Sequence, residues 1–333
     1  MLPDERLAAL RSTPDEALGI DGAFIREAMT AFGISPTVRH SRAAVQGTFH
    51  RLYDIDAADG EGKLLRIAAL AGDENAEVMM LESRLATALR GWDFPVPSCE
   101  FRGVPQATGM RGVHLMARAD GRSLTSFDDD EPRMQAALAQ VARFLARLHA
   151  RRGTGFGPLS TESGAGLRGV HERWDDYVLL RLDEHVRHCE AAGAISAVEA
   201  RAVASRFDQG RDALRVQPSA LLHGDPGSHN FMVDSSGEIR AVIDWEDALL
   251  GDPLFDLASL CTFHPERRHG GIWSAYGAAL QPGGDAWPRF WLYFLRMALA
   301  KTVHRRRFGY TDAPGRAPAS RRIQLALQRL GEA

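Results

Sequence analysis

The apolar positions in the first third of the chain switch between helical and strand spacing. Residues 3–33 contain two short stretches with helical spacing, the second ending at the turn "FGISP". Residues 52–55 and 64–67 are β-type runs on either side of a turn rich in glycine and aspartate, a pattern typical of a hairpin. Residues 74–90 have helical spacing, and the run "VHLMA" at 113–117 predicts a further strand. The apolar face of the predicted helix consists of Val78, Leu81, Leu85 and Leu89.

The pattern becomes mainly helical after this strand. The segment "RMQAALAQVARFLARLHA" carries one apolar stripe, which is typical of a helix packed in a core. The stripe consists of Met134, Leu138, Val141, Leu145 and Leu148. Further helices are expected at 172–191, 195–214, 253–262 and 285–307, and after Tyr310. Two short β runs, "HNFMVD" and "EIRAVIDW", lie among these helices and are joined by the turn "SSGE".

These elements predict an α+β fold with two lobes. We expect a small β-rich N-terminal lobe with a helical preface at residues 1–117, and a larger α-helical C-terminal lobe at 118–333. The linker would lie near residues 117–122. A chain of 333 residues, 45% of them hydrophobic, is long and apolar enough to build both lobes.

Composition and charge exclude several classes of protein. The formal net charge of −3 gives no strong overall field, so we expect neither nucleic acid nor a membrane as a partner. The three cysteines are far apart and lack CxxC spacing, which argues against a disulfide framework or a zinc cage. The N-terminus lacks signal-peptide features, and the apolar segment "FWLYFLRMALAK" is interrupted by Arg296. We therefore expect a cytoplasmic monomer or homodimer that acts on a small molecule.

Residues 221–260 hold the densest group of chemically active side chains. Asp225 and Asn230 are five positions apart, and Asp244 follows at the end of a β run. Hard divalent cations such as Mg²⁺ take one or two protein carboxylates or amides together with phosphate oxygens, and Asn230 and Asp244 supply such ligands. A hydroxyl that attacks a phosphoryl group needs an acceptor for its proton, a role open to Asp225.

Three blocks of this segment resemble one enzyme family. "HGDPGSHN", "IDWE" and "GDPLFDLASL" are similar, in this order, to the motifs of the aminoglycoside phosphotransferase family, whose members are relatives of the protein kinases. The resemblance implies a protein-kinase-like fold with a nucleotide-binding N-terminal lobe and a C-terminal lobe for catalysis and acceptor binding. It implies that Asp225 is the catalytic base and that Asn230 and Asp244 bind Mg²⁺. Asp256 would be a buried brace that hydrogen-bonds the catalytic loop.

The N-terminal half resembles the same family less closely. "VQGTFHRLYDID" is similar to the turn that covers the phosphates, with Gly47 as its one glycine. In "KLLRIAAL", Arg66 matches the basic residue that contacts the nucleotide phosphates, with Lys63 as the alternative. Glu82 matches the helix acid that holds this basic residue, with Glu77 as the competitor.

The hinge and the overall activity also follow from the resemblance. The backbone of Met116 to Arg118, in "VHLMARADG", would meet the adenine edge. The chain would use ATP or GTP and Mg²⁺ to phosphorylate a hydroxyl of a small molecule, either an antibiotic, in resistance, or a housekeeping metabolite such as a sugar or an amino alcohol. Two other classes stay open: a zinc or iron hydrolase using His223, Asp225 and His229, and a catalytically silent kinase-like binding module.

Several polar residues have simpler structural interpretations. We expect His223 to shape the loop, and Asp252 and Asp256 to lie near a helix start, where carboxylates cap backbone N–H groups. His149 would complement the end of its helix. The basic runs "HPERRHGG" and "HRRRFGY" are typical of solvated surfaces, and the acids of "HERWDDY" are candidates for a pocket that binds a cationic substrate.

Overall fold

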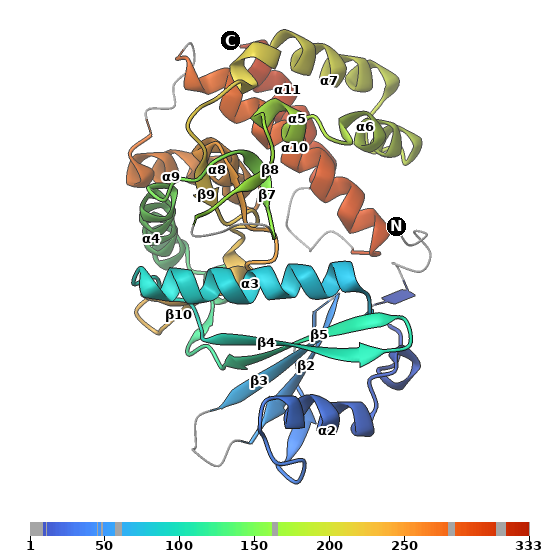
Figure 1. Cartoon of the computed structure of the whole chain (residues 1–333). Helices are drawn as coiled ribbons and strands as arrows, with labels where there is room; N and C mark the ends of the chain where they lie inside the picture. Colours follow the sequence, from blue (N-terminus) through green and yellow to red (C-terminus); the bar gives the residue numbers. More distant parts are fainter. Residues whose placement is uncertain are drawn as a thin grey trace. The chain divides into compact units, whose positions relative to one another are not determined.

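The computed structural model describes residues 9–10, 12–44, 46–47, 49–56, 62–161, 166–278, 284–310 and 318–332. The chain divides into two compact units, whose elements are labelled in Figure 1. Unit 1 comprises Met1–Gly121 together with Arg240–Glu246, and unit 2 comprises Arg122–Ile239 together with Asp247–Ala333. Unit 1 therefore includes a late segment of the chain that carries Asp244. The sequence alone placed the division four residues earlier and assigned that late segment to the second lobe.

Unit 1 is built on a five-stranded antiparallel sheet in the order β1-β2-β3-β5-β4. Its strands are β1 (His40–Arg42), β2 (His50–Ile55), β3 (Lys63–Ala68), β4 (Cys99–Gln106) and β5 (Gly109–Ala117). The predicted hairpin is confirmed as the β2–β3 pair, in which Leu52 faces Arg66. β4 was not predicted, because Gly103 and Pro105 interrupt its apolar pattern.

The helices of unit 1 are η1 (Glu16–Leu18), α2 (Gly22–Ala31) and α3 (Asp73–Gly91). α3 packs on β4 and β5 and approaches β5 closely at Gly112, where a β-carbon would lie 2.7 Å from the sulfur of Met79. The predicted helix is confirmed, but its predicted apolar face is wrong at Val78, which is 44% exposed. The buried face is instead made by Ala76, Met79, Glu82, Leu85, Ala86 and Leu89. A charged residue, Glu82, thus lies on the packed side of the helix.

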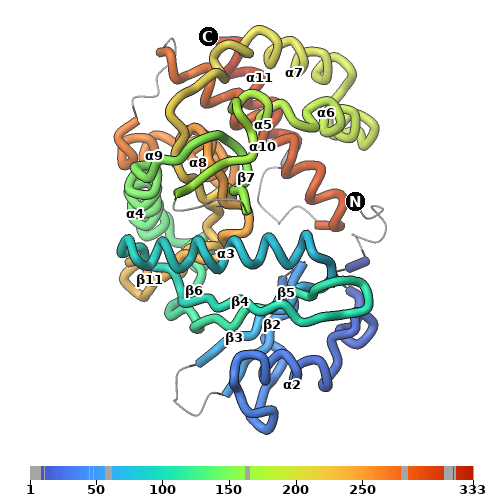
Figure 2. Tube along the Cα trace, viewed as in Figure 1, coloured from blue at the N-terminus to red at the C-terminus, as the bar shows by residue number. Residues whose placement is uncertain are grey.

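Unit 2 is mainly helical and contains two small sets of strands. Its helices are η2 (Leu124–Phe127), α4 (Glu131–His149), α5 (Trp174–Val178), α6 (Leu182–Ala191), α7 (Ala197–Gln209), η3 (Arg211–Leu214), η4 (Ser228–Asn230), α8 (Pro253–Thr262), η5 (Glu266–Arg268), α9 (His269–Tyr276), α10 (Ala286–Arg307) and α11 (Ala319–Gly331). Helix α10 packs against α6, α8 and α11, and α4 packs against α9 (Figure 2).

The strands of unit 2 place the functional loops. β6 (Arg122–Ser123) pairs with β10 (Phe231–Val233), and a four-stranded sheet has the order β8-β7-β12-β9. The strands of that sheet are β7 (Phe156–Leu159), β8 (Gly169–His171), β9 (Ala220–Leu222) and β12 (Leu249–Gly251). β11 (Ile239–Val242) begins in unit 2 and continues in unit 1.

Local sequence signals explain some of the helix boundaries in unit 2. Asp252 accepts a hydrogen bond from the backbone N–H of Leu254 and caps α8, as predicted, while Pro253 occupies the first turn. The helix predicted at 172–191 is wrong as a single element, because Arg181 adopts a left-handed backbone conformation between α5 and α6. α9 was not predicted. No helix among the described residues has the length and apolarity required to cross a membrane.

Candidate active site

Arg66 and Glu82 form a buried ion pair in unit 1. Arg66 lies in the middle of β3, and its Nη1 atom donates a hydrogen bond to Glu82 Oε2 at 2.5 Å. Glu82 lies on the packed face of α3, whereas its competitor Glu77 is exposed on the same helix. The contact expected between the basic residue of the strand and the acid of the helix is therefore present, with Arg66 rather than Lys63 as the partner of Glu82.

Arg66 also contacts the late segment that belongs to unit 1. Its Nη2 atom lies 3.1 Å from Asp244 Oδ1 and 2.7 Å from Glu246 Oε2. The same nitrogen donates to His50 Nδ1 at 3.1 Å, since a guanidinium has only donors. Three carboxylates thus surround one guanidinium, which leaves the cluster with an excess of negative charge. Such a cluster attracts a cation.

Charge balance decides the protonation states of this cluster. Burial alone would lower the pKa of Arg66, but the carboxylates of Glu82, Glu246 and Asp244 raise it above its ordinary value. Burial opposes the ionisation of Glu82, yet the neighbouring guanidinium keeps the pKa of Glu82 below its usual range. Burial and the positive charge of Arg66 lower the pKa of His50 well below that of a free histidine. His50 is therefore neutral at pH 7.

The backbone at Asp244 is strained. Its φ angle of 66° lies in the left-handed region, which residues other than glycine rarely adopt. The neighbouring Trp245 holds this conformation, because its backbone N–H donates to Glu82 Oε1 at 3.2 Å and its ring nitrogen donates to the carbonyl of Val242 at 3.1 Å. The Asp244 side chain is 41% exposed, so its carboxylate is accessible. A carboxylate oxygen is a suitable ligand for Mg²⁺.

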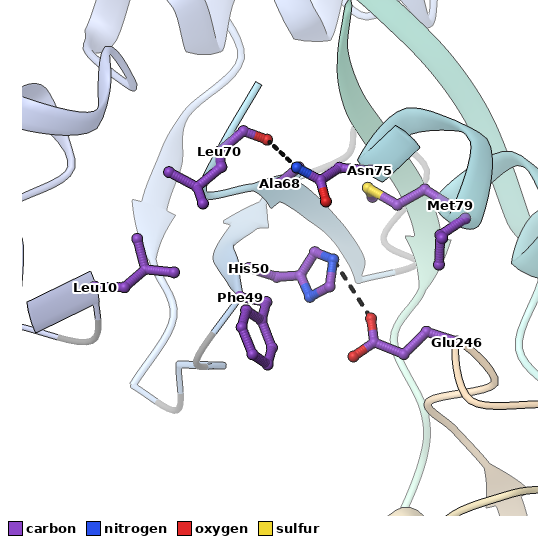
Figure 3. A pocket seen from close by; sticks show the side chains of 9 residues that line it. Leu10, Phe49, His50, Ala68, Leu70, Asn75, Met79 and Glu246 are labelled. Atoms are coloured by element: carbon purple, nitrogen blue, oxygen red, sulfur yellow. Dashed lines mark hydrogen bonds and ion pairs between the residues drawn. The ribbon is translucent and has the colours of Figure 1, made fainter. Parts of the chain in front are cut away.

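A pocket opens beside this cluster within unit 1 (Figure 3). Its volume is ≈ 180 Å³, smaller than the roughly 300 Å³ at which drug-sized ligand pockets begin. His50 and Glu246 form part of its wall, where His50 Nε2 lies 3.6 Å from Glu246 Oε2. Phe49 and Met79 supply apolar surface. The pocket therefore places a polar edge next to the partners of Arg66, but it does not have room for a whole nucleotide.

The predicted phosphate-covering turn and hinge are both located in unit 1. The turn between β1 and β2 contains Gly47 and is closed by Gln46, whose side-chain nitrogen donates to the carbonyls of Ala43 and Leu52. Met116 lies near the end of β5, paired with Leu64 and Cys99. The nucleotide contacts assigned to Gly47 and Met116 stay predictions.

The backbone of the hinge is already engaged on both sides. The N–H of Ala117 donates to the carbonyl of Ser98, and the N–H of Arg118 donates to the carbonyl of Gly62. The side chain of Arg118 forms an ion pair with Asp54. An adenine edge at Arg118 would therefore have to displace a backbone hydrogen bond or use carbonyl oxygens, and the contact stays a prediction.

The loop that carries Asp225 follows β9 in unit 2 and is fixed by Asp256. Asp256 is fully buried near the start of α8, and its carboxylate accepts hydrogen bonds from the backbone N–H groups of His223 at 2.7 Å and Gly224 at 3.0 Å. The prediction that Asp256 braces the loop is confirmed. His149 donates to the same carboxylate through Nε2 at 3.1 Å, so its Nδ1 accepts from the hydroxyl of Tyr276. His149 lies in the last turn of α4, as expected, and in addition it supports the carboxylate of the brace.

Position 224 requires glycine, both because of its backbone conformation and because a neighbouring residue lies very close. Its φ angle is 87°, and a β-carbon there would lie 2.0 Å from the carbonyl oxygen of Asp247. The chain can therefore turn tightly after His223 and present Asp225 next. The Asn230 side chain is buried and donates through Nδ2 to the carbonyl of Asp225 at 3.0 Å. Its amide oxygen, the atom that a metal would take, is not the atom used in this bond.

Asp225 is ionised and held by two nitrogen groups. Its Oδ1 lies 3.5 Å from Lys301 Nζ, and its Oδ2 lies 3.4 Å from His229 Nε2. Burial opposes the ionisation of Asp225, but Lys301 and His229 outweigh it and hold the pKa of this carboxyl well below its usual range. The side chain is partly exposed, so an ionised carboxylate is available to an acceptor. Its role as catalytic base stays a prediction.

The remaining polar candidates have structural surroundings. The His223 ring is fully buried and stacks on Phe231, in agreement with its expected structural role. Asp175, one of the acids expected to line a cationic-substrate pocket, is buried and paired with Arg173, so that expectation is wrong for this residue. Arg268, in a run expected to be solvated, is buried and paired with Glu131. Among the described residues, no three or more His, Cys, Asp or Glu side chains are grouped to hold a metal ion, as a zinc hydrolase would require.

The structure thus brings the predicted site residues together in two groups. Unit 1 gathers Arg66, Glu82 and Asp244, and unit 2 gathers Asp225 and Asn230. Sequence reasoning assigned no role to His50, Glu246 or Lys301, which contact these groups directly. Glu246 has a signal in the sequence, since it lies two positions after Asp244, but His50 and Lys301 have none.

Comparisons with known proteins agree with this architecture. The family described as "Phosphotransferase enzyme family" matches residues 44–292. The Hygromycin-B 4-O-kinase of Escherichia coli is 26% identical over 257 residues, which cover 76% of this chain and 71% of that enzyme.

Solved structures show the same fold. A thermostable mutant of aminoglycoside phosphotransferase APH(4)-Ia, in a ternary complex with AMP-PNP and hygromycin B, has a TM-score of 0.64 and 21% identity, covering 92% of this chain and 98% of that chain. A Thermobifida fusca protein provisionally assigned as a fructosamine-3-kinase has a TM-score of 0.60 and 19% identity, covering 94% of this chain and 100% of that chain. The predicted α+β, kinase-like fold is confirmed.

Proposed function

Because the chain belongs to the phosphotransferase enzyme family, we propose that it transfers the terminal phosphoryl group of ATP or GTP to a hydroxyl of a small molecule, with Mg²⁺. The observation that carries this proposal is the position of Asp244. Its backbone is strained, and its accessible carboxylate is held beside the buried Arg66–Glu82 pair. Strained backbone persists where the surrounding structure enforces it, which is common at functional sites.

Each residue has a defined role in this proposal. Asp225, ionised and partly exposed, accepts a hydrogen bond from the acceptor hydroxyl and takes its proton as the new bond to phosphorus forms. Arg66, held by Glu82, binds phosphate oxygens. Asp244 and Asn230 each offer an oxygen ligand to Mg²⁺, which, when bound, neutralises negative charge on the phosphates. Catalysis then consists mainly of positioning and charge stabilisation.

The nucleotide assignment is supported by the complex of a related fold. APH(4)-Ia binds AMP-PNP, and the present chain has the buried Arg66–Glu82 pair that the family resemblance assigns to phosphate binding. The choice between ATP and GTP depends on hinge backbone groups, which serve both bases. The cytoplasmic location expected from the sequence stays a prediction.

Of the two acceptor classes, an antibiotic or a housekeeping metabolite, the charge around Asp225 favours the metabolite. A polycationic aminoglycoside requires carboxylates that are not already neutralised. In unit 2, Glu184 is paired with Arg181 and Arg307, and the ammonium of Lys301 lies 3.5 Å from Asp225 Oδ1. A neutral or anionic hydroxyl compound, such as a sugar or a sugar derivative, therefore fits this side of Asp225 better. The likeness to the protein provisionally assigned as a fructosamine-3-kinase supports the same candidate.

A phosphotransfer screen tests the proposal. The purified full chain is incubated with ATP or GTP labelled in the terminal phosphate and with panels of aminoglycosides, sugars, sugar acids and amino alcohols. We expect transfer to at least one hydroxyl compound, dependent on Mg²⁺ and lost in Asp225→Asn. The absence of both transfer and nucleotide binding would contradict the proposal and favour a silent binding module. Hydrolysis that proceeds without nucleotide would favour a hydrolase.

A further inference from the structure

Lys301 is a largely buried cation in direct contact with Asp225. It lies near the end of α10, and its side chain is 15% exposed. Its Nζ atom is 3.5 Å from Asp225 Oδ1 and 3.2 Å from the centre of the Phe263 ring. Lysine is rarely buried unless its charge is paired, so this placement requires an explanation. Both residues belong to unit 2, and they are far apart in the sequence.

The two oxygens of Asp225 have separate nitrogen partners. Lys301 Nζ lies 3.5 Å from Oδ1, and His229 Nε2 lies 3.4 Å from Oδ2. A carboxylate held at one oxygen can still rotate about its last bond, but one held at both oxygens has a fixed plane. A fixed plane sets the direction from which a hydroxyl can approach the carboxylate.

Phe263 also contacts the ammonium group of Lys301. The ammonium group lies over the face of the ring, where cation–π attraction adds to the ion pair. Phe263 follows the last residue of α8, the helix that also carries the brace Asp256. One short helix thus positions the loop backbone through Asp256 and the Lys301 ammonium group through Phe263.

We propose that Lys301 is a positioning residue for Asp225, keeping its carboxylate ionised and oriented toward the acceptor hydroxyl. This inference rests on the proposed function, in which Asp225 is the base. A loose phosphoryl-transfer transition state gains little from a strong base and much from an oriented acceptor. An ammonium group beside the carboxylate weakens it as a base but fixes its charge and its direction.

The protonation of Lys301 is set by groups from several elements. Burial lowers its pKa to about 8, against the opposing effect of Asp225. Arg322 on α11 also lowers the pKa, and Asp247 raises it. His304, one turn further along α10, has its own pKa lowered by burial and is neutral at pH 7. Lys301 is therefore charged at neutral pH and loses its charge above about pH 8.

The test compares the full-length protein with Lys301→Met and Lys301→Arg, using nucleotide hydrolysis with water as acceptor and any phosphotransfer found in the screen. In Lys301→Met we expect kcat to fall about tenfold with little change in the KM for nucleotide. We also expect the decline of kcat above about pH 8, which in the wild type follows the loss of the Lys301 proton, to be absent in Lys301→Met, because methionine has no proton to lose. Arg306→Met, which removes an exposed charge from the same helix, is the control and should leave the pH profile unchanged.

Lys301→Arg provides a second readout that does not depend on the folding of Lys301→Met. In the wild type, kcat should decline above about pH 8, as Lys301 loses its proton. Arginine stays charged, so this basic limb should move to higher pH in Lys301→Arg. The inference would be overturned if the decline of kcat at high pH were the same in the wild type and in Lys301→Arg. A decline of kcat above about pH 8 in Lys301→Met that matches the wild type would overturn it too.

Asp225→Asn separates this inference from the proposed function. If Asp225→Asn keeps wild-type turnover, the catalytic base is wrongly assigned and the proposed mechanism fails. If Asp225→Asn is inactive while both Lys301 variants keep the wild-type pH profile, Asp225 remains the base and only the role of Lys301 is refuted.

Discussion

Arg66 Nη1 donates a hydrogen bond to Glu82 Oε2 at 2.5 Å, and both side chains are almost fully buried in unit 1. A buried ion pair of this kind adds little net stability, because taking both charges out of water offsets their attraction. Removing one partner is costly, because the other charge is then left buried. The pair therefore constrains the position of Arg66 more than it stabilises the fold.

Glu82→Ala should destabilise the protein by about 3 kcal/mol, since Arg66 would keep only the more exposed Asp244 and Glu246 as carboxylate partners. Nucleotide binding should weaken as well, because Arg66 is no longer fixed. Urea denaturation and calorimetric titration with nucleotide measure the two effects. Glu77→Ala, on the exposed side of the same helix, is the matched control and should change stability by less than about 0.5 kcal/mol. Equal effects of the two variants would contradict the role of Glu82.

Asp225→Asn should keep nucleotide binding and lower kcat by roughly 10²–10⁴-fold, the usual contribution of a positioned acid–base group. The wild-type pH profile gives an independent check. Because Lys301 and His229 hold the pKa of Asp225 below its ordinary value, the carboxylate stays ionised through the usual aspartate titration near pH ~3.9. The acidic limb of kcat should therefore lie below that pH, as long as the protein stays folded. Wild-type turnover by Asp225→Asn would remove Asp225 from its role.

Elements with regular apolar spacing were predictable from the sequence. The β2–β3 hairpin and the helices α3, α4, α8 and α10 follow from the spacing of apolar residues, and the start of α8 also follows from its cap Asp252. β4 was missed because it contains glycine and proline, and the break at Arg181 was missed because a left-handed arginine leaves no sequence signal. The error at Val78 arose because Glu82, although charged, lies on the packed side of α3.

The candidate site was predictable only where its residues lie close together in the sequence. The blocks "HGDPGSHN" and "GDPLFDLASL" led to Asp225 and to its brace Asp256, and the family match confirms the resemblance they carry. Lys301 lies within an ordinary helical pattern, and only the packing of α10 on α8 brings it near the loop. His149 also has no motif of its own, because its partner Asp256 is distant in the sequence.

Asp256→Asn should lower kcat without changing nucleotide affinity. An asparagine keeps one acceptor oxygen but presents an amino group to the second of the two backbone N–H groups, His223 and Gly224. One buried donor then loses its partner, which should cost about 1–3 kcal/mol and loosen the loop that carries Asp225. Thermal unfolding and steady-state kinetics measure both effects. The exposed Asp208→Asn on α7 is the control. Unchanged kcat and stability in Asp256→Asn would show that the brace is dispensable.

Asp244→Asn should weaken the Mg²⁺ dependence of nucleotide binding. Asparagine is chosen because it tolerates the left-handed backbone at this position better than alanine does, so the substitution removes the charge without adding strain. The affinity for nucleotide in the presence of Mg²⁺ should fall on the order of tenfold, or about 1.4 kcal/mol. The affinity without Mg²⁺ should be unchanged or stronger, because one negative charge near the phosphates is lost. Calorimetric titrations at several Mg²⁺ concentrations measure the difference.

The control for this experiment is Asp56→Asn, an exposed aspartate of unit 1 whose partner Arg39 is also exposed. It should leave the Mg²⁺ titration unchanged, since Asp56 is not among the carboxylates that contact Arg66. A general loss of surface charge would affect both variants alike, whereas loss of a metal ligand affects only Asp244→Asn. If the Mg²⁺ titration of Asp244→Asn matches that of the wild type, Asp244 does not bind the metal, and its strained backbone serves only to complete the network of Arg66, Glu82 and Trp245.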